Sequence, residues 1–288
     1  MVKVKSNTYI YLLVSIIILV IIYVYDNKLS YKIKMFNVPF HIPRKNNSGP
    51  KTVSDVPLVI YESWSSNTVP EKMKKNIYTL LESNPEFDYY LYSDEASYDF
   101  IKKHFDNDVL EAFVTLKPGA YKSDLWRYCI LYINGGVYMD IKYTTIVPLI
   151  DIIKMTPTVY VNDMDTSNLR TKECIYNGFM ISPPNNIVLK DCIDEIVENC
   201  KKKFYGANSL DVTGPCLLGR IIKKHDATLR GKNKYRYNES SFIFRTGYII
   251  YDDKPMLKTY PEYRIEQEMK QSVEHYGTLW SKGDIFNV

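Results

Sequence analysis

The stretch GAYKSDLWRYCILYINGGVYMDIKY, residues 119–143, contains a helical segment, a two-glycine turn and a strand that ends in a single acid. Helical spacing starts directly after Pro118 and continues to Ile133. Residues 134–136 (Asn-Gly-Gly) follow, and residues that tolerate a positive φ end a helix at low cost. From Val137 onward alternate side chains point to opposite sides, which is typical of a strand. The stretch therefore predicts a helix–turn–strand unit.

Two charged residues of this helix lie on one face. Asp124 and Arg127 are three positions apart, with Ala120 and Leu131 on the same line. Such a pair is most often a surface salt bridge that contributes about a few tenths of a kcal/mol. A carboxylate and a guanidinium on a partly apolar face also need partners, and Asp140 leaves the end of the strand just beyond. Both interpretations stay open here: an exposed ion pair, or one site built from all three side chains.

The chain from Pro57 onward alternates strands and helices. Apolar strands are predicted at 58–61, 88–92, 158–162 and 178–181, helices at 70–81, 94–104, 186–204 and 215–224, and a strand pair at 242–251. This alternation predicts an α/β domain with a mainly parallel sheet. Ligands of such sheets bind beyond the carboxyl ends of the strands, where Trp64 and Asp140 fall.

The central stretch resembles the sugar-binding region of the Asp-x-Asp (DXD) glycosyltransferases. The shared order is a small residue, Ser-Asp, an aromatic residue, Arg-Tyr, Leu-Tyr and Gly-Gly-x-Tyr-x-Asp. These enzymes include glycosyltransferase family 32, with the yeast initiating α-1,6-mannosyltransferase, and more distantly the large clostridial glucosylating toxins. Further blocks resemble the family in the same order: VIYESW (59–64), NPEFDYYLYSDEASYDFIKKHF (84–105), LKPGAYKSD (116–124), YNGFMISPPNN (176–186), VTGPCLLGRII (212–222) and HYGTLW (275–280).

The resemblance implies a GT-A-like fold, that is, a Rossmann-like, mainly parallel central sheet with flanking helices. It also implies a nucleotide-sugar donor, a glycan or glycoprotein acceptor, and three catalytic residues, Asp124, Arg127 and Asp140. Asp124 would accept hydrogen bonds from hydroxyls of the ribose or donor sugar, and Arg127 would contact the sugar and stabilise charge. Asp140 would be the first acid of the metal motif.

The same resemblance assigns further residues to the donor pocket. Trp64 would stack near the nucleotide base, Tyr138 would line the pocket, and Asn177 would border the acceptor side. A C-terminal loop with His275, Thr278 and Trp280 would close over the diphosphate, so that His275 and Thr278 are possible contributors to a metal site.

One position departs from the family pattern. The second acid of the Asp-x-Asp motif is replaced by Lys142, on the same side of the strand as Asp140. Lys142 would either pair with Asp140 or supply positive charge to the diphosphate directly. A second Asp-x-Asp at residues 163–165 is an alternative metal site or a polar loop. We expect Asp140 to take part in binding Mn²⁺ or Mg²⁺, hard cations that prefer carboxylate oxygens.

The N-terminal part of the chain predicts a membrane anchor. Residues 1–8 form a short tail, and residues 9–25 (YIYLLVSIIILVIIYVY) carry no charge, near the lower length limit for a bilayer span. Residues 26–54, with prolines and no sustained period, read as a stem, and residues 55–288 as the catalytic domain. The family resemblance implies a type II protein of the secretory pathway with a lumenal domain. Lysines after the span outnumber those before it, which favours the opposite orientation.

Composition excludes several other classes of protein. The 288 residues are 45% hydrophobic and 24% charged, as in ordinary globular proteins. A net charge of +4 with scattered lysines is not a nucleic-acid footprint. The five cysteines form no CxxC pair, so we expect mostly buried free thiols with one or two long-range disulfides in a lumenal domain. No Walker loop or Gly-x-Ser-x-Gly sequence is present.

The sequence thus predicts a single-pass membrane glycosyltransferase that moves a hexose from a UDP- or GDP-sugar onto a glycan or glycoprotein, with retention of configuration implied by the resemblance. Two alternatives remain. Lys142 also suits a catalytically inactive relative that binds a nucleotide-sugar or glycan as an adaptor. A membrane-anchored structural protein without a small-molecule site is the other alternative.

Overall fold

The structure is a computed structural model that describes residues 11, 13–19, 34–163, 174–229, 242–270 and 274–287. The chain divides into two compact units, Met1–Met35 and Phe36–Val288. Most of the expected membrane span lies outside the described residues, and its described positions, 11 and 13–19, are helical. No helix within the described residues has the length and apolar character needed to span a bilayer.

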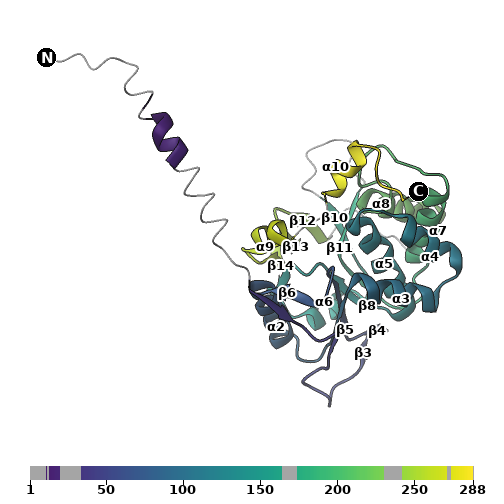
Figure 1. Cartoon of the computed structure of the whole chain (residues 1–288). Coiled ribbons are helices and arrows are strands. Elements are labelled where there is room, and N and C mark those ends of the chain that lie inside the picture. The colour runs from purple at the N-terminus through teal and green to yellow at the C-terminus, as the bar shows by residue number, and fades with distance from the viewer. Residues whose placement is uncertain are drawn as a thin grey trace. The chain divides into compact units, whose positions relative to one another are not determined.

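A ten-stranded sheet organises the larger unit (Figure 1). The strand order is β2-β7-β5-β8-β11-β10-β12-β13-β14-β9, and two small sheets pair β1 with β6 and β3 with β4. The strands are β1 (Met35–Asn37), β2 (His41–Ile42), β3 (Thr52–Val53), β4 (Val56–Pro57), β5 (Val59–Ser63), β6 (Thr68–Pro70), β7 (Asp88–Tyr92), β8 (Gly136–Met139), β9 (Tyr143–Thr145), β10 (Val159–Asp163), β11 (Ile175–Ser182), β12 (Phe242–Arg245), β13 (Tyr248–Tyr251) and β14 (Lys254–Thr259).

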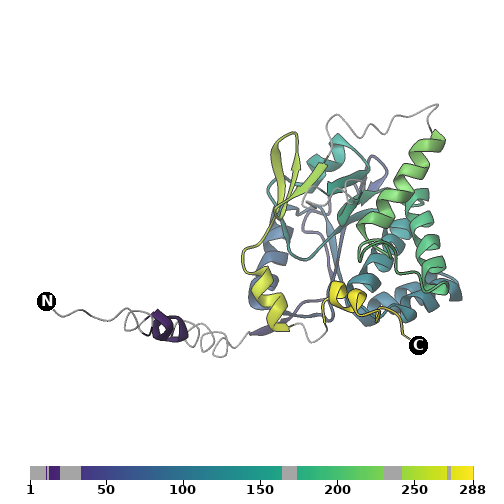
Figure 2. The same cartoon turned by 90° about the horizontal axis from the view of Figure 1, so that it is seen from above.

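Helices cover both faces of this sheet, so the unit has three layers (Figure 2). The helices are α2 (Glu71–Ser83), α3 (Asp94–His104), α4 (Asn107–Thr115), α5 (Gly119–Asn134), α6 (Leu149–Met155), α7 (Ile187–Lys201), α8 (Pro215–Leu229), α9 (Tyr263–Lys270) and α10 (Tyr276–Ser281). One hydrophobic core contains residues of α3, α4, α5, α7 and α8, and the other contains residues of α2 and α6. The strands β5, β7, β8 and β11 contribute to both cores because successive side chains point to opposite faces.

The prediction of an α/β domain is confirmed, but the expectation of a mainly parallel sheet is wrong. Among the described strands, β5 runs parallel to β7 and β8, and β10 runs parallel to β12. The other neighbours in the sheet are antiparallel. Antiparallel hairpins such as β12–β13 need only a short turn, whereas each parallel pair needs a long crossover. The sheet is therefore mixed.

The helix–turn–strand unit at 119–143 forms as predicted, as α5 followed by β8. Gly135 and Gly136 have φ of 65° and 105°. A Cβ on Gly135 would lie 2.7 Å from Pro184, and one on Gly136 would lie 2.9 Å from the carbonyl oxygen of Val59. The two glycines thus let the chain reverse closely against its neighbours, which brings the end of β8 beside the first half of α5.

Part of the segment expected to be a stem belongs to the folded unit. His41 and Ile42 form β2, which pairs with β7 at one edge of the large sheet. Arg44 donates from Nε to Asp88 Oδ2 at 2.8 Å, which fixes this segment to the start of β7. The folded unit therefore begins near residue 36. The sequence did not predict this start, because a two-residue strand is too short to show a period.

Candidate active site

A cavity of about 570 Å³ opens where β5 and β8 end. Its walls come from the first half of α5, the segment after β8, the start of β11, the start of α8, the helix α9 and the residues around His275. The carboxyl ends of the parallel strands β5 and β8 meet at this edge, which is where ligands bind in open α/β sheets. As predicted, Trp64 directly follows β5 and Asp140 directly follows β8. Both side chains line the cavity.

Asp124 is a buried carboxylate with fixed neighbours from distant parts of the chain. Asn177 Nδ2 donates to Asp124 Oδ1 at 2.9 Å, and Thr213 Oγ1 donates to Asp124 Oδ2 at 2.7 Å. Burial raises the pKa of Asp124, although Arg127 and both hydrogen bonds act in the opposite direction. Asp124 is 8% exposed and Arg127 is also buried. The pair is therefore not the exposed surface salt bridge that the helix spacing alone would suggest.

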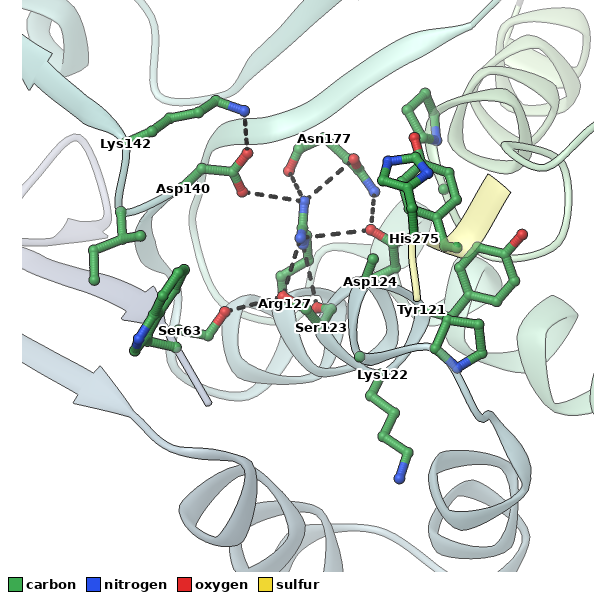
Figure 3. A pocket seen from close by; sticks show the side chains of 18 of the residues that line it. Ser63, Tyr121, Lys122, Ser123, Asp124, Arg127, Asp140, Lys142, Asn177 and His275 are labelled. Carbon is green, nitrogen blue, oxygen red and sulfur yellow. Dashed lines mark hydrogen bonds and ion pairs between the residues drawn. The ribbon is translucent and has the colours of Figure 1, made fainter. Parts of the chain in front are cut away.

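Arg127 occupies the centre of the group (Figure 3). Its Nη1 donates to the backbone oxygen of Asn177 at 2.9 Å, and its Nη2 donates to Ser123 Oγ at 3.0 Å. The guanidinium also lies 3.5 Å from Asp124 and 3.6 Å from Asp140. Arg127 therefore links both acids, and a rigid planar guanidinium is suited to that role.

Asp140 follows β8 and faces the cavity with both oxygens engaged. Oδ1 accepts from Tyr138 Oη at 2.9 Å, and Oδ2 accepts from Lys142 Nζ at 2.8 Å and from Tyr176 Oη at 3.1 Å. Burial opposes ionisation, but Lys142 and Arg127 outweigh it and lower the pKa of Asp140 to about 2. The carboxylate is therefore ionised at physiological pH.

The structure brings most of the residues singled out from the sequence to this cavity. Its lining includes Trp64, Asp124, Arg127, Tyr138, Asp140, Lys142, Asn177 and His275. Thr278 and Trp280 lie outside the lining. The indole of Trp280 instead donates to the backbone oxygen of Tyr205 at 2.6 Å. His275 accepts at Nδ1 from Gly277 N at 3.2 Å, as the N-cap of α10.

Several residues of the site were not singled out from the sequence. Ser63 at the end of β5 lies 2.9 Å, oxygen to oxygen, from Ser123 of α5. Tyr176 and Thr213 hold the two acids, and both stand in sequence blocks that resemble the family. No local sequence pattern marks these two hydroxyls as site residues, because Tyr176 contacts Asp140 and Thr213 contacts Asp124 across long stretches of the chain. Tyr263, Arg264 and Gln267 of α9 also line the cavity.

The side chains around Asp140 do not fit the divalent cation that an Asp-x-Asp motif implies. Mg²⁺ and Mn²⁺ require several oxygen ligands, commonly from more than one carboxylate. Here Asp140 accepts hydrogen bonds on both oxygens, and a lysine ammonium stands 2.8 Å from one of them. Among the described residues, no group of three or more His, Cys, Asp or Glu is arranged to hold a metal. In the second Asp-x-Asp, Asp163 lines the cavity, while residues 164 and 165 lie outside the described part.

Comparison with known proteins shows which family this region is similar to. Residues 70–159 match the family described as "Glycosyltransferase sugar-binding region containing DXD motif". The match spans α5, β8 and Asp140, and it confirms the resemblance to the DXD glycosyltransferases.

Individual relatives agree with this family. The chain is 31% identical over 96 residues to mannosyl phosphorylinositol ceramide synthase SUR1 of Saccharomyces cerevisiae, a match over 33% of this chain and 25% of that protein. It is 27% identical over 99 residues to the initiation-specific α-1,6-mannosyltransferase of Candida albicans, over 32% of this chain and 26% of that protein. The matched segment thus spans about a quarter of the length of these relatives. The solved PaToxG glycosyltransferase aligns over 60% of this chain and 70% of that chain, with 16% identity and a TM-score of 0.41.

Proposed function

We propose that this protein is a glycosyltransferase that moves a hexose from a UDP- or GDP-sugar to a glycan or glycoprotein acceptor, with retention of anomeric configuration. The catalytic unit is a GT-A-like domain, an assignment that the mixed sheet with helices on both faces and the cavity at the strand ends support. The relatives carry mannosyl transfer in their names, so mannose is the first donor sugar to test.

The observation that carries this proposal is the convergence of Asp124, Arg127 and Asp140. The three come from a helix and the end of the following strand, and Arg127 lies within 3.6 Å of both acids. They lie in one cavity, within the segment that matches the sugar-binding region. A structural protein without a small-molecule site gives no reason to bury two acids and an arginine around an open cavity, because buried charges are costly.

Arg127 and Asp124 each have a task in sugar transfer. The bond between sugar C1 and the diphosphate oxygen breaks, and its electron pair remains on the diphosphate. The acceptor hydroxyl oxygen bonds to C1, and its proton passes to the departing phosphate oxygen. Arg127 is held rigidly, so it stabilises the developing charge without first reorganising. Asp124 orients hydroxyls of the donor, since a carboxylate has acceptor sites beyond the two that Asn177 and Thr213 use.

We further propose that residues 9–25 anchor the protein in a membrane of the secretory pathway, with the catalytic unit in the lumen. The disulfide between Cys174 and Cys216 supports this location, because disulfides persist in oxidising compartments. The remaining cysteines, Cys129, Cys192 and Cys200, are buried free thiols.

A donor screen tests the proposal directly. The full chain is incubated with GDP-mannose, UDP-glucose and other nucleotide-sugars, with and without Mn²⁺, and release of GDP or UDP is measured. For the donor that is used, Asp124→Asn and Arg127→Lys should each reduce turnover by at least about 100-fold, the scale of losing one aligned group. Asp151→Asn, on the exposed side of α6, is the matched control and should turn over normally. Normal turnover of both cavity variants would contradict the proposed site.

The pairing of Lys142 with Asp140 also favours a second candidate, an adaptor that binds nucleotide-sugars without cleaving them. The same screen separates the two functions. An adaptor would bind a nucleotide-sugar in equilibrium dialysis but release no nucleoside diphosphate, with or without acceptor glycans. An enzyme would release it in at least one of these conditions.

A further inference from the structure

The cavity already contains a fixed cation at the position where the family places its second acid. Lys142 Nζ lies 2.8 Å from Asp140 Oδ2, 5.2 Å from the centre of the Tyr143 ring and 5.4 Å from that of Tyr176. The Lys142 side chain is 19% exposed, so the ammonium is largely enclosed but still lines the cavity. A carboxylate and two aromatic faces attract an ammonium electrostatically, so these contacts hold it in place.

Backbone hydrogen bonds also fix the main chain from which Lys142 projects. The chain turns tightly after β8, where Tyr143 N donates to the Asp140 oxygen at 3.0 Å. The carbonyl oxygen of Lys142 accepts from Tyr260 N, also at 3.0 Å. Asp140 and Lys142 are therefore the first and third residues of one short turn, which the hydrogen bond between Asp140 and Tyr143 closes.

The charges around Asp140 leave little reason for a divalent ion to bind. Arg127 and Lys142 both lie beside this one carboxylate, at 3.6 and 2.8 Å, and Arg127 also lies 3.5 Å from Asp124, so the two cations already balance the two acids. A metal ion on Asp140 Oδ2 would have to displace Lys142 or sit next to it. Like charges at such a separation repel strongly in a partly buried site.

We propose that Lys142 replaces the divalent metal, so that this protein binds the diphosphate of its donor with its own ammonium and needs no metal ion. This inference rests on the proposed function, because it names how the same cavity holds a nucleoside diphosphate. An ammonium has three N–H donors, and Asp140 takes one of them. The others suit phosphate oxygens, as lysines do at other phosphate sites. When the C1–O bond breaks, the electron pair left on the diphosphate lies beside this positive charge.

Nucleoside diphosphate binding is the test, because it does not depend on turnover. UDP and GDP are titrated into the purified full chain by calorimetry, first in excess EDTA and then with millimolar Mn²⁺. For the nucleotide that binds, the affinity should agree within about twofold between the two conditions. Lys142→Met should weaken binding in EDTA by about 10- to 100-fold, the effect of losing one charge-assisted contact. Lys142→Arg should keep most of the affinity.

A second variant tests the inference by creating a metal site, so that metal-dependent nucleotide binding is gained. Lys142→Asp restores the Asp-x-Asp spacing, so its nucleotide binding should be at least about tenfold stronger with Mn²⁺ than in EDTA. Electron paramagnetic resonance should show Mn²⁺ bound to this variant with nucleotide, but not to the wild type. Lys258→Asp makes the same charge change on an exposed lysine of β14, outside the cavity lining, and should behave as the wild type.

Two results would overturn the inference, and they differ in whether the proposed function fails with it. If wild-type binding disappears in EDTA and returns with Mn²⁺, the metal is required and Lys142 does not replace it, while the proposed function stands. If neither UDP nor GDP binds in either condition, the nucleotide-sugar function fails and the inference fails with it. Thermal unfolding of each variant, compared with that of the wild type, separates loss of binding from loss of fold.

Discussion

At the scale of single residues, the most unusual group outside the site is a buried acid on the opposite face of β5. Glu62 is fully buried and accepts at Oε2 from Tyr89 Oη at 2.7 Å. Its Oε1 has no hydrogen-bond partner among the described residues. Burial raises the pKa of Glu62 to about 8, against the weaker effect of the Tyr89 hydrogen bond. The protein therefore folds with a neutral carboxyl group in its second core.

This residue makes the stability dependent on pH. An unfolded glutamate ionises near pH ~4.3, whereas folded Glu62 holds its proton up to about pH 8. The stabilisation that the protonated Glu62 contributes is complete below the pKa of the unfolded residue. It is lost as the pH rises from there through about 8, the pKa of Glu62 in the folded protein. The free energy of unfolding should fall by about 4 kcal/mol between pH ~4 and ~8 relative to that of Glu62→Gln. Urea unfolding across this range measures the difference.

Exposed Glu111 of α4 provides the comparison for Glu62. Glu111→Gln should follow the wild-type pH curve, because this carboxyl is in water in both states. A Glu62→Gln curve parallel to that of the wild type from pH ~4 to ~8 would show that Glu62 is ionised in the folded protein.

At the scale of secondary structure elements, the start of β11 fits against the end of β8 without space for a side chain. A Cβ on Gly178 would lie 2.5 Å from Asp140 Oδ2 and would also collide with the Tyr176 hydroxyl. Asp140 N donates to the Gly178 oxygen at 2.8 Å, so backbone and carboxylate share this approach. The glycine therefore sets the position of Asp140 from a neighbouring strand.

Gly178→Ala should displace Asp140 and Tyr176 together. We expect the free energy of unfolding to fall by about 1–3 kcal/mol, as for other overpacked sites. Nucleotide binding or turnover should fall by at least about tenfold, since the Asp140–Lys142 turn moves. Gly49→Ala is the control, because no atom lies within 4 Å of a Cβ at Gly49. Unchanged binding in Gly178→Ala would contradict the role given to this contact.

Another element, α9, caps a helix far from it in sequence. Glu266 Oε1 and Oε2 accept from the backbone nitrogens of Lys72 and Met73, each at 3.0 Å, and Tyr260 Oη donates to Oε2 at 2.9 Å. These amides belong to the first turn of α2, which has no side-chain cap of its own. A carboxylate there satisfies free amides and complements the helix dipole.

Glu266→Ala should therefore destabilise the protein by about 2–4 kcal/mol, since it leaves two amides and a buried hydroxyl without an acceptor. The same change should loosen α9 and the residues it contributes to the cavity, so the KM for donor or acceptor should rise. Denaturant unfolding and steady-state kinetics measure the two effects. Glu268→Ala, on the exposed side of α9, should leave both unchanged.

At the scale of the whole molecule, a disulfide joins two segments that hold Asp124. Cys174 precedes β11, which supplies Asn177, and Cys216 lies in the first turn of α8, just after Thr213. The bond closes a loop of 42 residues. The two donors to Asp124 are thereby tied to one another as well as to the acid.

Cys174→Ser with Cys216→Ser should lower the free energy of unfolding by about 2–4 kcal/mol, the usual effect of opening a loop of this length. Donor affinity should fall as well, because Asn177 and Thr213 become free to move apart. Reductant should lower the melting temperature of the wild type but not that of the double variant. A reductant effect of equal size in both proteins would show that another group is responsible.

Across the whole molecule, local features of the fold could be predicted from the sequence, whereas contacts between distant segments could not. Helix α5, the two glycines and β8 were predicted because periodicity and turn residues act locally. The convergence of Asp124, Arg127 and Asp140 was expected from helix spacing and strand ends, and the structure shows it. The direction of β11 was not predicted, because pairing with β8 depends on contacts across the chain. Thr213 and Glu266 were missed for the same reason.

The link between Glu266 and α2 also bears on how the protein is made. Glu266 follows Lys72 by 194 residues. A ribosome adds about 5–20 residues per second, so α2 leaves it some 10–40 s before its cap exists. During that interval the first turn of α2 has only water for its amides, and the wall formed by α9 is absent. The cavity is therefore completed only near the end of translation, and a nascent chain stalled before Glu266 would expose an unfinished cavity wall to chaperones.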